Sequence, residues 1–192
     1  MKKIYLIGAG GHCHSCIDVI ETEKKYEIAG IFDVDSKVGQ KVLGYPIIGT
    51  DEDIEKYIQP DHYFLITVGQ IKSAGKRKAL FEMLGNLKAQ FAVVVSPRAW
   101  VSPHSEIGVG TIVMHDALIN VKASVGVNCI INTKALIEHD AIIESHCHIS
   151  TAAVVNGNCH VKEGSFIGSN SVLKEGALVE KLSVLGAGAF HR

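Results

Sequence analysis

Residues 117–149 read ALINVKASVGVNCIINTKALIEHDAIIESHCHI and repeat one pattern every six positions. An aliphatic residue closes each unit, and a small residue lies two positions before it. The pattern holds from residue 96 to residue 185, where the closing residues are Val101, Ile107, Val113, Ile119, Val125, Ile131, Ile137, Ile143, Ile149, Val155, Val161, Ile167, Leu173, Val179 and Leu185. The small residues are Ala99, Ser105, Thr111, Ala117, Ala123, Cys129, Ala135, Ala141, Cys147, Ala153, Cys159, Ser165, Ser171, Ala177 and Ser183. So many matches in register do not arise by chance.

A period of six excludes the ordinary regular structures, because an amphipathic helix repeats near 3.6 and a lone strand at two. One aliphatic and one small residue per unit suit a short strand followed by a tight corner. Three units then form a triangular coil of eighteen residues. Successive coils stack about 4.8 Å apart and bury the aliphatic column, while the small residues fit where the walls converge. We predict a parallel β-helix of hexapeptide repeats over residues 96–192.

Residues 1–95 follow a different pattern, in which short apolar runs alternate with segments whose apolar residues are spaced as on one face of a helix. The runs predict strands at residues 4–7, 28–32, 63–68 and 91–95. Helices are expected at residues 13–22 and 74–84. Alternation of this kind predicts an α/β domain with a small Rossmann-like parallel sheet. The chain therefore divides into residues 1–95 and 96–192.

Composition and charge exclude several classes of partner. Lys and Arg total 19 against 20 Asp and Glu, a formal net charge of −1. That balance predicts no binding of nucleic acid. No apolar run approaches the roughly 18 residues of a membrane-spanning helix, so no membrane partner is expected. Five cysteines, without a pair of C-x-x-C motifs, favour free thiols in a reducing compartment. We expect a cytoplasmic protein.

A glycine-rich turn follows the first predicted strand, with Gly8, Gly10 and Gly11. Glycines between a strand and a helix let a phosphate approach the backbone and the helix N-terminus. An acidic residue after the second strand, Asp33 or Asp35, is placed to accept from a ribose or a base edge. A tight turn with no ligand explains the same glycines equally well. Cys13 replaces the last glycine of the dinucleotide fingerprint, which disfavours a nicotinamide cofactor.

Histidines are frequent, and two groups of them suggest chemistry. His12 and His14 lie beside two cysteines, but no second Cys/His pair follows at a metal-site interval, so no metal is expected. Six histidines fall in the repeats, mostly at outward positions: His104, His115, His139, His146, His148 and His160. His139 lies between Glu138 and Asp140, and a carboxylate beside an imidazole makes it a better general base.

Two sets of motifs carry a family resemblance. In the repeats they are NTKALIEHDAII at residues 132–143 and SHCHIS at residues 145–150. In the first half they are GAGGH at residues 8–12, FDVD at residues 32–35, Val68-Gly69, and Arg77 beyond. Together they resemble bacterial UDP-amino-sugar N-acetyltransferases and their relatives, the sialic acid O-acetyltransferases. The resemblance implies a left-handed β-helix, acetyl-CoA as cosubstrate, and a homotrimer with active sites between neighbouring prisms.

The resemblance also assigns roles to individual residues. It implies that His139 is the general base and that Asp140 raises its pKa. It implies that His148 contacts acetyl-CoA near the thioester and that Ser169 and Ala187 lie along the pantetheine arm. The residues it implies for the nucleotide sugar are Gly10, Gly11, His12, Asp33, Asp35 and Gly69. Asn132, one hexad before the base, is a further candidate to position the acceptor. The sequence lacks the Gly-Val-Pro-Ala tail of relatives, and we expect this to affect coenzyme affinity.

The expected reaction is acetyl transfer from acetyl-CoA to the amine of a UDP-linked amino-sugar, by direct attack. A sugar or sialic acid O-acetyltransferase is the first alternative, because the motifs do not distinguish amine from hydroxyl acceptors. A zinc-dependent carbonic anhydrase on the same prism needs two histidines five positions apart, which the repeats lack. A trimeric scaffold without activity is the remaining alternative. A scaffold would need neither a glycine-loop domain nor a histidine flanked by acidic residues, so these features favour an enzyme.

Overall fold

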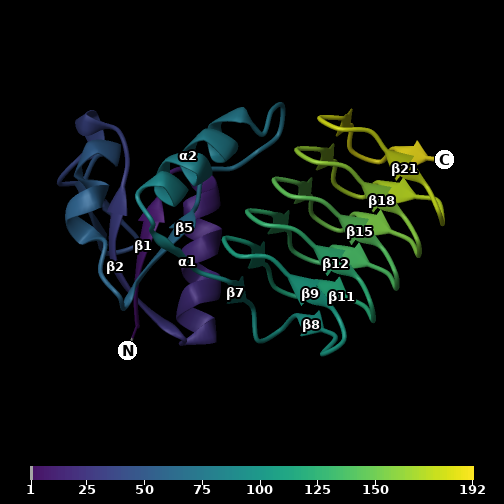
Figure 1. Ribbon diagram of the computed structural model, residues 1–192, viewed down its shortest axis with the longest axis horizontal. Coiled ribbons are helices and arrows are strands. Elements are labelled where there is room, and N and C mark those ends of the chain that lie inside the picture. Colours follow the sequence, from purple (N-terminus) through teal and green to yellow (C-terminus); the bar gives the residue numbers. More distant parts are fainter. Residues whose placement is uncertain (1) are drawn as a thin grey trace.

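The computed structural model describes residues 2–192, which form an α/β domain followed by a prism of stacked coils (Figure 1). The first domain contains, in chain order, β1 (Lys2–Ile7), α1 (Gly11–Glu23), β2 (Tyr26–Phe32), η1 (Asp35–Lys37), β3 (Lys41–Val42), β4 (Tyr45–Gly49), η2 (Asp51–Tyr57), β5 (His62–Ile66), α2 (Gly75–Asn86) and β6 (Gln90–Phe91). Its sheet has the order β3-β4-β2-β1-β5-β6 and is parallel except where β3 meets β4. Neither the length nor the apolar character of any helix in residues 2–192 suits a membrane span.

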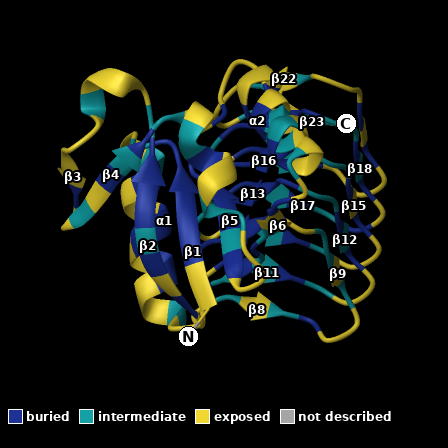
Figure 2. Cartoon of the chain, turned by 60° about the vertical axis from the view of Figure 1, so that its left-hand side comes forward, coloured by how far each residue is buried: buried dark blue, intermediate teal, exposed yellow. Residues whose placement is uncertain are grey.

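Both faces of this sheet are covered, which explains its continuous apolar strands. In β1, Ile4 and Leu6 pack with α1, while Tyr5 and Ile7 pack with η2 and α2 on the other face. Figure 2 shows the upper parts of β1 and β2 buried, with exposed residues at the start of β1. The predicted parallel α/β domain is confirmed.

The prism is a left-handed parallel β-helix of two-residue strands arranged in three sheets. The first face contains β7 (Val94–Val95), β10 (Ile112–Val113), β13 (Ile130–Ile131), β16 (His148–Ile149), β19 (Phe166–Ile167) and β22 (Val184–Leu185). The second face contains β8 (Trp100–Val101), β11 (Leu118–Ile119), β14 (Leu136–Ile137), β17 (Val154–Val155), β20 (Val172–Leu173) and β23 (Phe190–His191). The third face contains β9 (Glu106–Ile107), β12 (Ser124–Val125), β15 (Ile142–Ile143), β18 (His160–Val161) and β21 (Leu178–Val179).

Pairing between coils follows the predicted register, because each strand pairs with the strand eighteen residues later. Ile119 pairs with Ile137 and Ile137 with Val155, and all three are fully buried. The small residues of the repeat join the same core, Cys129 and Cys147 among them. Both are free thiols inside the prism. The hexapeptide prediction is confirmed.

A left-handed residue recurs once per hexad and turns the chain at each corner. The residues with positive φ in the prism are Gly110, Asp116, Lys122, Asn128, Lys134, Asp140, His146, Ala152, Asn158, Gly164, Asn170, Gly176, Leu182 and Gly188. This conformation is costly for residues other than glycine, asparagine and aspartate. The stacked coils must therefore stabilise it at positions such as Leu182.

The predicted strand at residues 91–95 is wrong, because the chain leaves one sheet and enters the other within it. Phe91 pairs with β5, whereas Val94 pairs with β10 of the prism. Between them, the N–H of Ala92 donates to Phe64 O at 3.0 Å, and its carbonyl accepts from Gly110 N at 2.9 Å. Ala92 thus hydrogen-bonds to both domains, and the chain passes from one sheet to the other there.

The α/β domain packs on the first face of the prism. Apolar side chains of α1 share a core with Ile112, Met114 and Ile130, and Figure 1 shows α1 between the parallel sheet and the prism. Among residues 2–192, the hydrogen bonds and ion pairs between the two domains all involve this face, its two flanking corners or the connecting residues 92–95. The second face makes none of these contacts, whereas Ser124 and Ile142 of the third face line a pocket with Lys78 and Glu82 of α2.

Candidate active site

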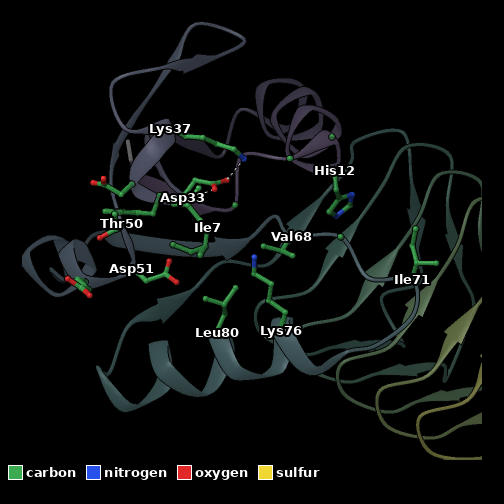
Figure 3. A pocket seen from close by; sticks show the side chains of 18 residues that line it. Ile7, His12, Asp33, Lys37, Thr50, Asp51, Val68, Ile71, Lys76 and Leu80 are labelled. Carbon is green, nitrogen blue, oxygen red and sulfur yellow. Dashed lines mark hydrogen bonds and ion pairs between the residues drawn. The ribbon is translucent and has the colours of Figure 1, made fainter.

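A cavity of about 890 Å³ opens at the carboxyl ends of β1, β2 and β5 (Figure 3). Parallel α/β sheets commonly bind ligands at this edge, where the strand order reverses. The structure brings together here all six residues expected to hold a nucleotide sugar: Gly10, Gly11, His12, Asp33, Asp35 and Gly69. They come from separate parts of the first domain, and one cavity collects them.

The glycine loop between β1 and α1 forms one wall of the cavity. Gly8 has φ +107°, and a Cβ there would lie 2.5 Å from Val68 Cγ2, so only glycine fits. Gly10 caps α1 without a side-chain hydrogen bond, and a Cβ built on Gly10 or Gly11 meets nothing within 4 Å. The start of this 13-residue helix is thus open to the cavity, with its amide dipoles directed at an incoming anion.

The two acidic residues after β2 differ in how much of their hydrogen-bonding capacity is used. Asp33 accepts hydrogen bonds from the backbone N–H of Ala9, from Val34 N at 2.7 Å and from Lys37 Nζ at 3.1 Å. Partial burial raises the pKa of Asp33, but these three donors outweigh it and hold the pKa below its ordinary value. Asp33 therefore ties the glycine loop to β2. Asp35 is exposed at the start of η1.

Two imidazoles lie where the cavity meets the prism, the half-buried His12 and the buried His148. The ring centroids of His12 and His148 are 6.5 Å apart. Burial lowers the pKa of His12 to about 3, with the Arg77 charge contributing, and lowers the pKa of His148 to about 4. Both imidazoles are therefore neutral at physiological pH. Nε2 of His12 is buried without a hydrogen-bond partner in the described residues, which leaves it for a ligand.

Hydrogen bonds fix the tautomer of His148. Its Nδ1 lies 2.6 Å from Gln70 O, and a carbonyl only accepts, so Nδ1 carries the proton. Its Nε2 then accepts from Asn132 Nδ2 at 3.1 Å, while Asn132 Oδ1 accepts from Thr133 N at 2.8 Å. Both ring nitrogens are occupied, so His148 is unsuited to proton transfer. The same bonds place Asn132 beside His148 rather than beside His139.

Arg77 anchors the floor of the cavity to the prism. The guanidinium is fully buried and donates from Nη1 to Ile66 O and Val68 O, both at 2.7 Å. Its Nη2 donates to Asn128 Oδ1 at 2.7 Å across the domain boundary. Burial lowers the pKa of Arg77 to about 10, so it stays charged at neutral pH. Arg77 belongs to the motifs of the first half of the sequence, but the role of Arg77 depends on contacts with residues distant in the chain.

The expected coenzyme residues lie beside the corner between the first and second faces. Ser169 and Ala187 follow β19 and β22 of the first face at equivalent positions of successive coils. Ser169 Oγ lies 3.0 Å from Ser150 Oγ. They share this side of the prism with Asn132 and His148.

His139 and Asp140 form the predicted imidazole–carboxylate pair. His139 Nδ1 lies 2.9 Å from Asp140 Oδ2, so Nδ1–H donates to the carboxylate and Nε2 keeps a free lone pair. This hydrogen bond raises the pKa of His139 above its ordinary value. The left-handed backbone of Asp140, φ 58°, is one of the recurrent corner residues.

Gly157 lies next to the His139 ring in the following coil, a feature that the sequence reading missed. A Cβ at Gly157 would meet His139 Cε1 at 2.7 Å and Nε2 at 2.9 Å. Because equivalent residues of adjacent coils are eighteen apart, a glycine eighteen positions after His139 is the signal that identifies it.

The structure does not bring His139 to the cavity of its own chain. His139 follows β14 at the corner between the second and third faces, whereas the α/β domain packs on the first face. The two sets of expected site residues thus lie on different sides of the prism. Residues 2–192 contain no group of three or more His, Cys, Asp or Glu arranged to hold a metal ion.

Comparison with known proteins finds a family model that matches the first domain and curated relatives of part of the chain. Residues 3–84 match the family described as the PglD N-terminal domain. The chain is 33% identical over 117 residues to UDP-N-acetylbacillosamine N-acetyltransferase of Bacillus subtilis (strain 168), covering 59% of this chain and 52% of that protein. The chain spans 23% and 52% of the lengths of the two curated relatives it matches.

Solved structures resemble the whole chain. The acetyltransferase domain of PglB from Neisseria gonorrhoeae FA1090 superposes with a TM-score of 0.92 at 29% identity, covering 100% of this chain and 92% of that one. Its complex with acetyl coenzyme A gives 0.88 at 28% identity, covering 97% and 89%. PerB from Caulobacter crescentus, in complex with CoA and GDP-perosamine, gives 0.91 at 26% identity, covering 99% and 88%. The resemblance and the fold expected from the sequence are confirmed.

Proposed function

We propose that this protein transfers an acetyl group from acetyl-CoA to the amine of a nucleotide-linked amino-sugar. The observation that carries the proposal is the cavity at the glycine loop, in a chain whose whole fold matches acetyltransferases. The PglB domain was solved with acetyl coenzyme A, and PerB with CoA and GDP-perosamine. We take UDP as the nucleotide, as the sequence resemblance implies. A cytoplasmic location, which agrees with five free cysteines, would supply the cosubstrate.

In the proposed reaction His139 acts as the general base. As the amine nitrogen attacks the thioester carbonyl carbon, His139 Nε2 takes a proton from that nitrogen. Asp140 holds the opposite ring nitrogen at 2.9 Å and stabilises the imidazolium. The C–S bond then breaks, and the thiolate takes the proton from the imidazolium. The products are the sugar amide and free CoA thiol, with no covalent acyl-enzyme.

The proposed base and the proposed substrate cavity must come from different copies of the chain. His139 lies at the corner away from its own α/β domain. The second face, which leads into that corner, presents only apolar side chains outward, and these are Trp100, Leu118, Leu136, Val154, Val172 and Phe190. Trp100 is 62% exposed and Phe190 59%, and the four side chains between them are half-buried. An outward row of apolar side chains on one face favours contact with another protein surface. We propose that a homotrimer covers this face and completes the site.

Thiol release from acetyl-CoA tests the proposed function. Purified protein is incubated with UDP-linked and GDP-linked amino-sugars, their N-acetylated products, and free sialic acid. Release with an amino-sugar nucleotide alone supports the proposal and identifies the nucleotide. Release with a hydroxyl acceptor alone replaces it with O-acetylation. If no acceptor gives release and acetyl-CoA does not stabilise the protein thermally, the result contradicts the proposal and favours a scaffold without activity.

A further inference from the structure

Lys76 is the one lysine lining the cavity whose charge has no ion-pair partner in the described residues. The other lysine there, Lys37, is paired with Asp33 at 3.1 Å. Lys76 lies in the first turn of α2, and Figure 3 shows its ammonium directed toward the middle of the cavity, between Val68 and Asp51. Lys76 acts electrostatically on Asp51 without forming an ion pair with it in the described residues, and a cation directed into a cavity in this way favours an anionic ligand.

The cavity wall formed by the glycine loop is also suited to an anion. It contains the open N-terminus of α1 at Gly10 and Gly11, where no side chain caps the helix. The helix N-terminus and Lys76 line the same cavity. Phosphate oxygens are bound by backbone N–H groups and by lysine point charges in this kind of setting.

The charges differ between the two ends of the cavity. Thr50 and Asp51 lie at the end away from the prism, whereas His12 and Ile71 lie at the end toward the prism (Figure 3). Burial raises the pKa of Asp51, an effect that the Lys76 charge opposes. Carboxylates repel phosphate but accept hydrogen bonds from ribose hydroxyls and from N–H groups of a base. His12 offers a buried, unpartnered Nε2 at the other end.

We propose that Lys76 binds the diphosphate of the nucleotide-linked sugar, with the nucleoside at the Asp51 end of the cavity and the sugar at the His12 end. This inference rests on the proposed function, because it assigns an orientation to that substrate. It places the sugar next to His148 and the prism. It also makes Lys76 a determinant of specificity, since a free amino-sugar has no diphosphate to offer it.

Titration calorimetry with UDP, GDP, uridine and guanosine tests the proposal on wild type, Lys76→Met, Lys76→Arg and Lys72→Met. Lys72 is an exposed lysine four residues earlier that does not line the cavity, and it serves as the matched control. We expect Lys76→Met to raise the Kd of the bound nucleoside diphosphate by about 10- to 100-fold, the range for loss of a charge-assisted hydrogen bond. Lys76→Arg and Lys72→Met should stay within a few-fold of wild type. Binding of the nucleosides should be the same in all four proteins.

The outcomes separate the two proposals. Equal diphosphate affinity in wild type and Lys76→Met overturns the role of Lys76 and leaves the function standing. An equal loss of nucleoside and diphosphate affinity also overturns it, because the cavity itself has then changed. If wild type binds neither UDP nor GDP, the proposed function fails and the inference fails with it.

Discussion

Gly157→Ala perturbs the His139 ring without removing any functional group. Gly157 has no positive φ, so alanine is compatible with its backbone. The added Cβ would lie 2.7 Å from Cε1 and 2.9 Å from Nε2 of His139, whereas ordinary contacts of a Cβ lie at 3.4–4 Å. To reach the ordinary contact distance, Cε1 of the exposed ring must therefore move by about 0.7 Å, or the ring must rotate away from Asp140.

The size of that movement sets the expected loss of activity. A displacement approaching 1 Å of a catalytic group costs up to about 100-fold. We expect Gly157→Ala to lower kcat by about 10- to 100-fold while the KM for acetyl-CoA and the melting temperature do not fall. A compatible Gly→Ala change commonly stabilises a protein by about 0.4–1 kcal/mol, so lost activity would come without lost stability.

The assay is thiol release at saturating acetyl-CoA, with thermal unfolding measured on the same samples. Gly85→Ala is the matched control, because a Cβ at Gly85 in α2 meets nothing within 4 Å. It should keep full activity. Full activity in Gly157→Ala, with an unchanged pH profile, would show that the His139 ring does not pack against Gly157 or that its position does not matter for catalysis.

Three further predictions follow from other parts of the structure. Asp140→Asn should lower kcat and shift the acid limb of the pH–kcat profile to lower pH, because Asp140 raises the pKa of His139; an unshifted limb would show that another group titrates. Ile137→Ala should cost about 2–5 kcal/mol of unfolding free energy by urea titration, whereas outward Ile142→Ala should cost less than about 1 kcal/mol; similar losses would mean that the register is wrong. His148 has a depressed folded pKa, about 4 against 6.5 unfolded, so the unfolded state binds more protons between these values and stability falls as pH drops below 6.5. At pH 5 the loss from His148 is about 2 kcal/mol, and His148→Asn should lessen the fall between pH 7 and pH 5 by that amount.

The prism was predictable because its repeat is periodic. Every inward position of a coil stacks on the position eighteen residues away, so Ile119, Ile137 and Val155 must all suit the same column. The strand at residues 91–95 was not predictable in the same way. Its apolar residues suit either sheet, and only the hydrogen bonds of Ala92 to both sheets decide where the chain crosses.

The candidate site was partly predictable for a geometric reason. Strands β1, β2 and β5 are parallel, so residues at their carboxyl ends converge, as do Gly10, Asp33 and Gly69. The sequence did not indicate which residues of the site are free to bind a ligand and which ones hold the site together. Asp33 uses its oxygens to hold the glycine loop, and Arg77 holds the cavity floor through carbonyl groups on two domains. Both roles depend on contacts distant in sequence.

A complementation experiment tests the central claim, a site shared between copies, most directly. His139→Ala removes the proposed base, and Gly10→Phe fills the cavity from a position where a Cβ meets no neighbour. Each variant alone should be inactive, and Gly10→Phe should bind no nucleoside diphosphate. The two chains are then co-expressed with different tags, and mixed oligomers are purified.

Mixed trimers should recover about a third of the wild-type rate of thiol release, because one of the three sites in each mixed trimer is built from two intact halves when the halves come from different copies. If base and cavity belonged to one chain, every site would carry one of the two defects. Activity no higher than that of either variant alone, in mixed oligomers that unfold like the wild type, would contradict the account.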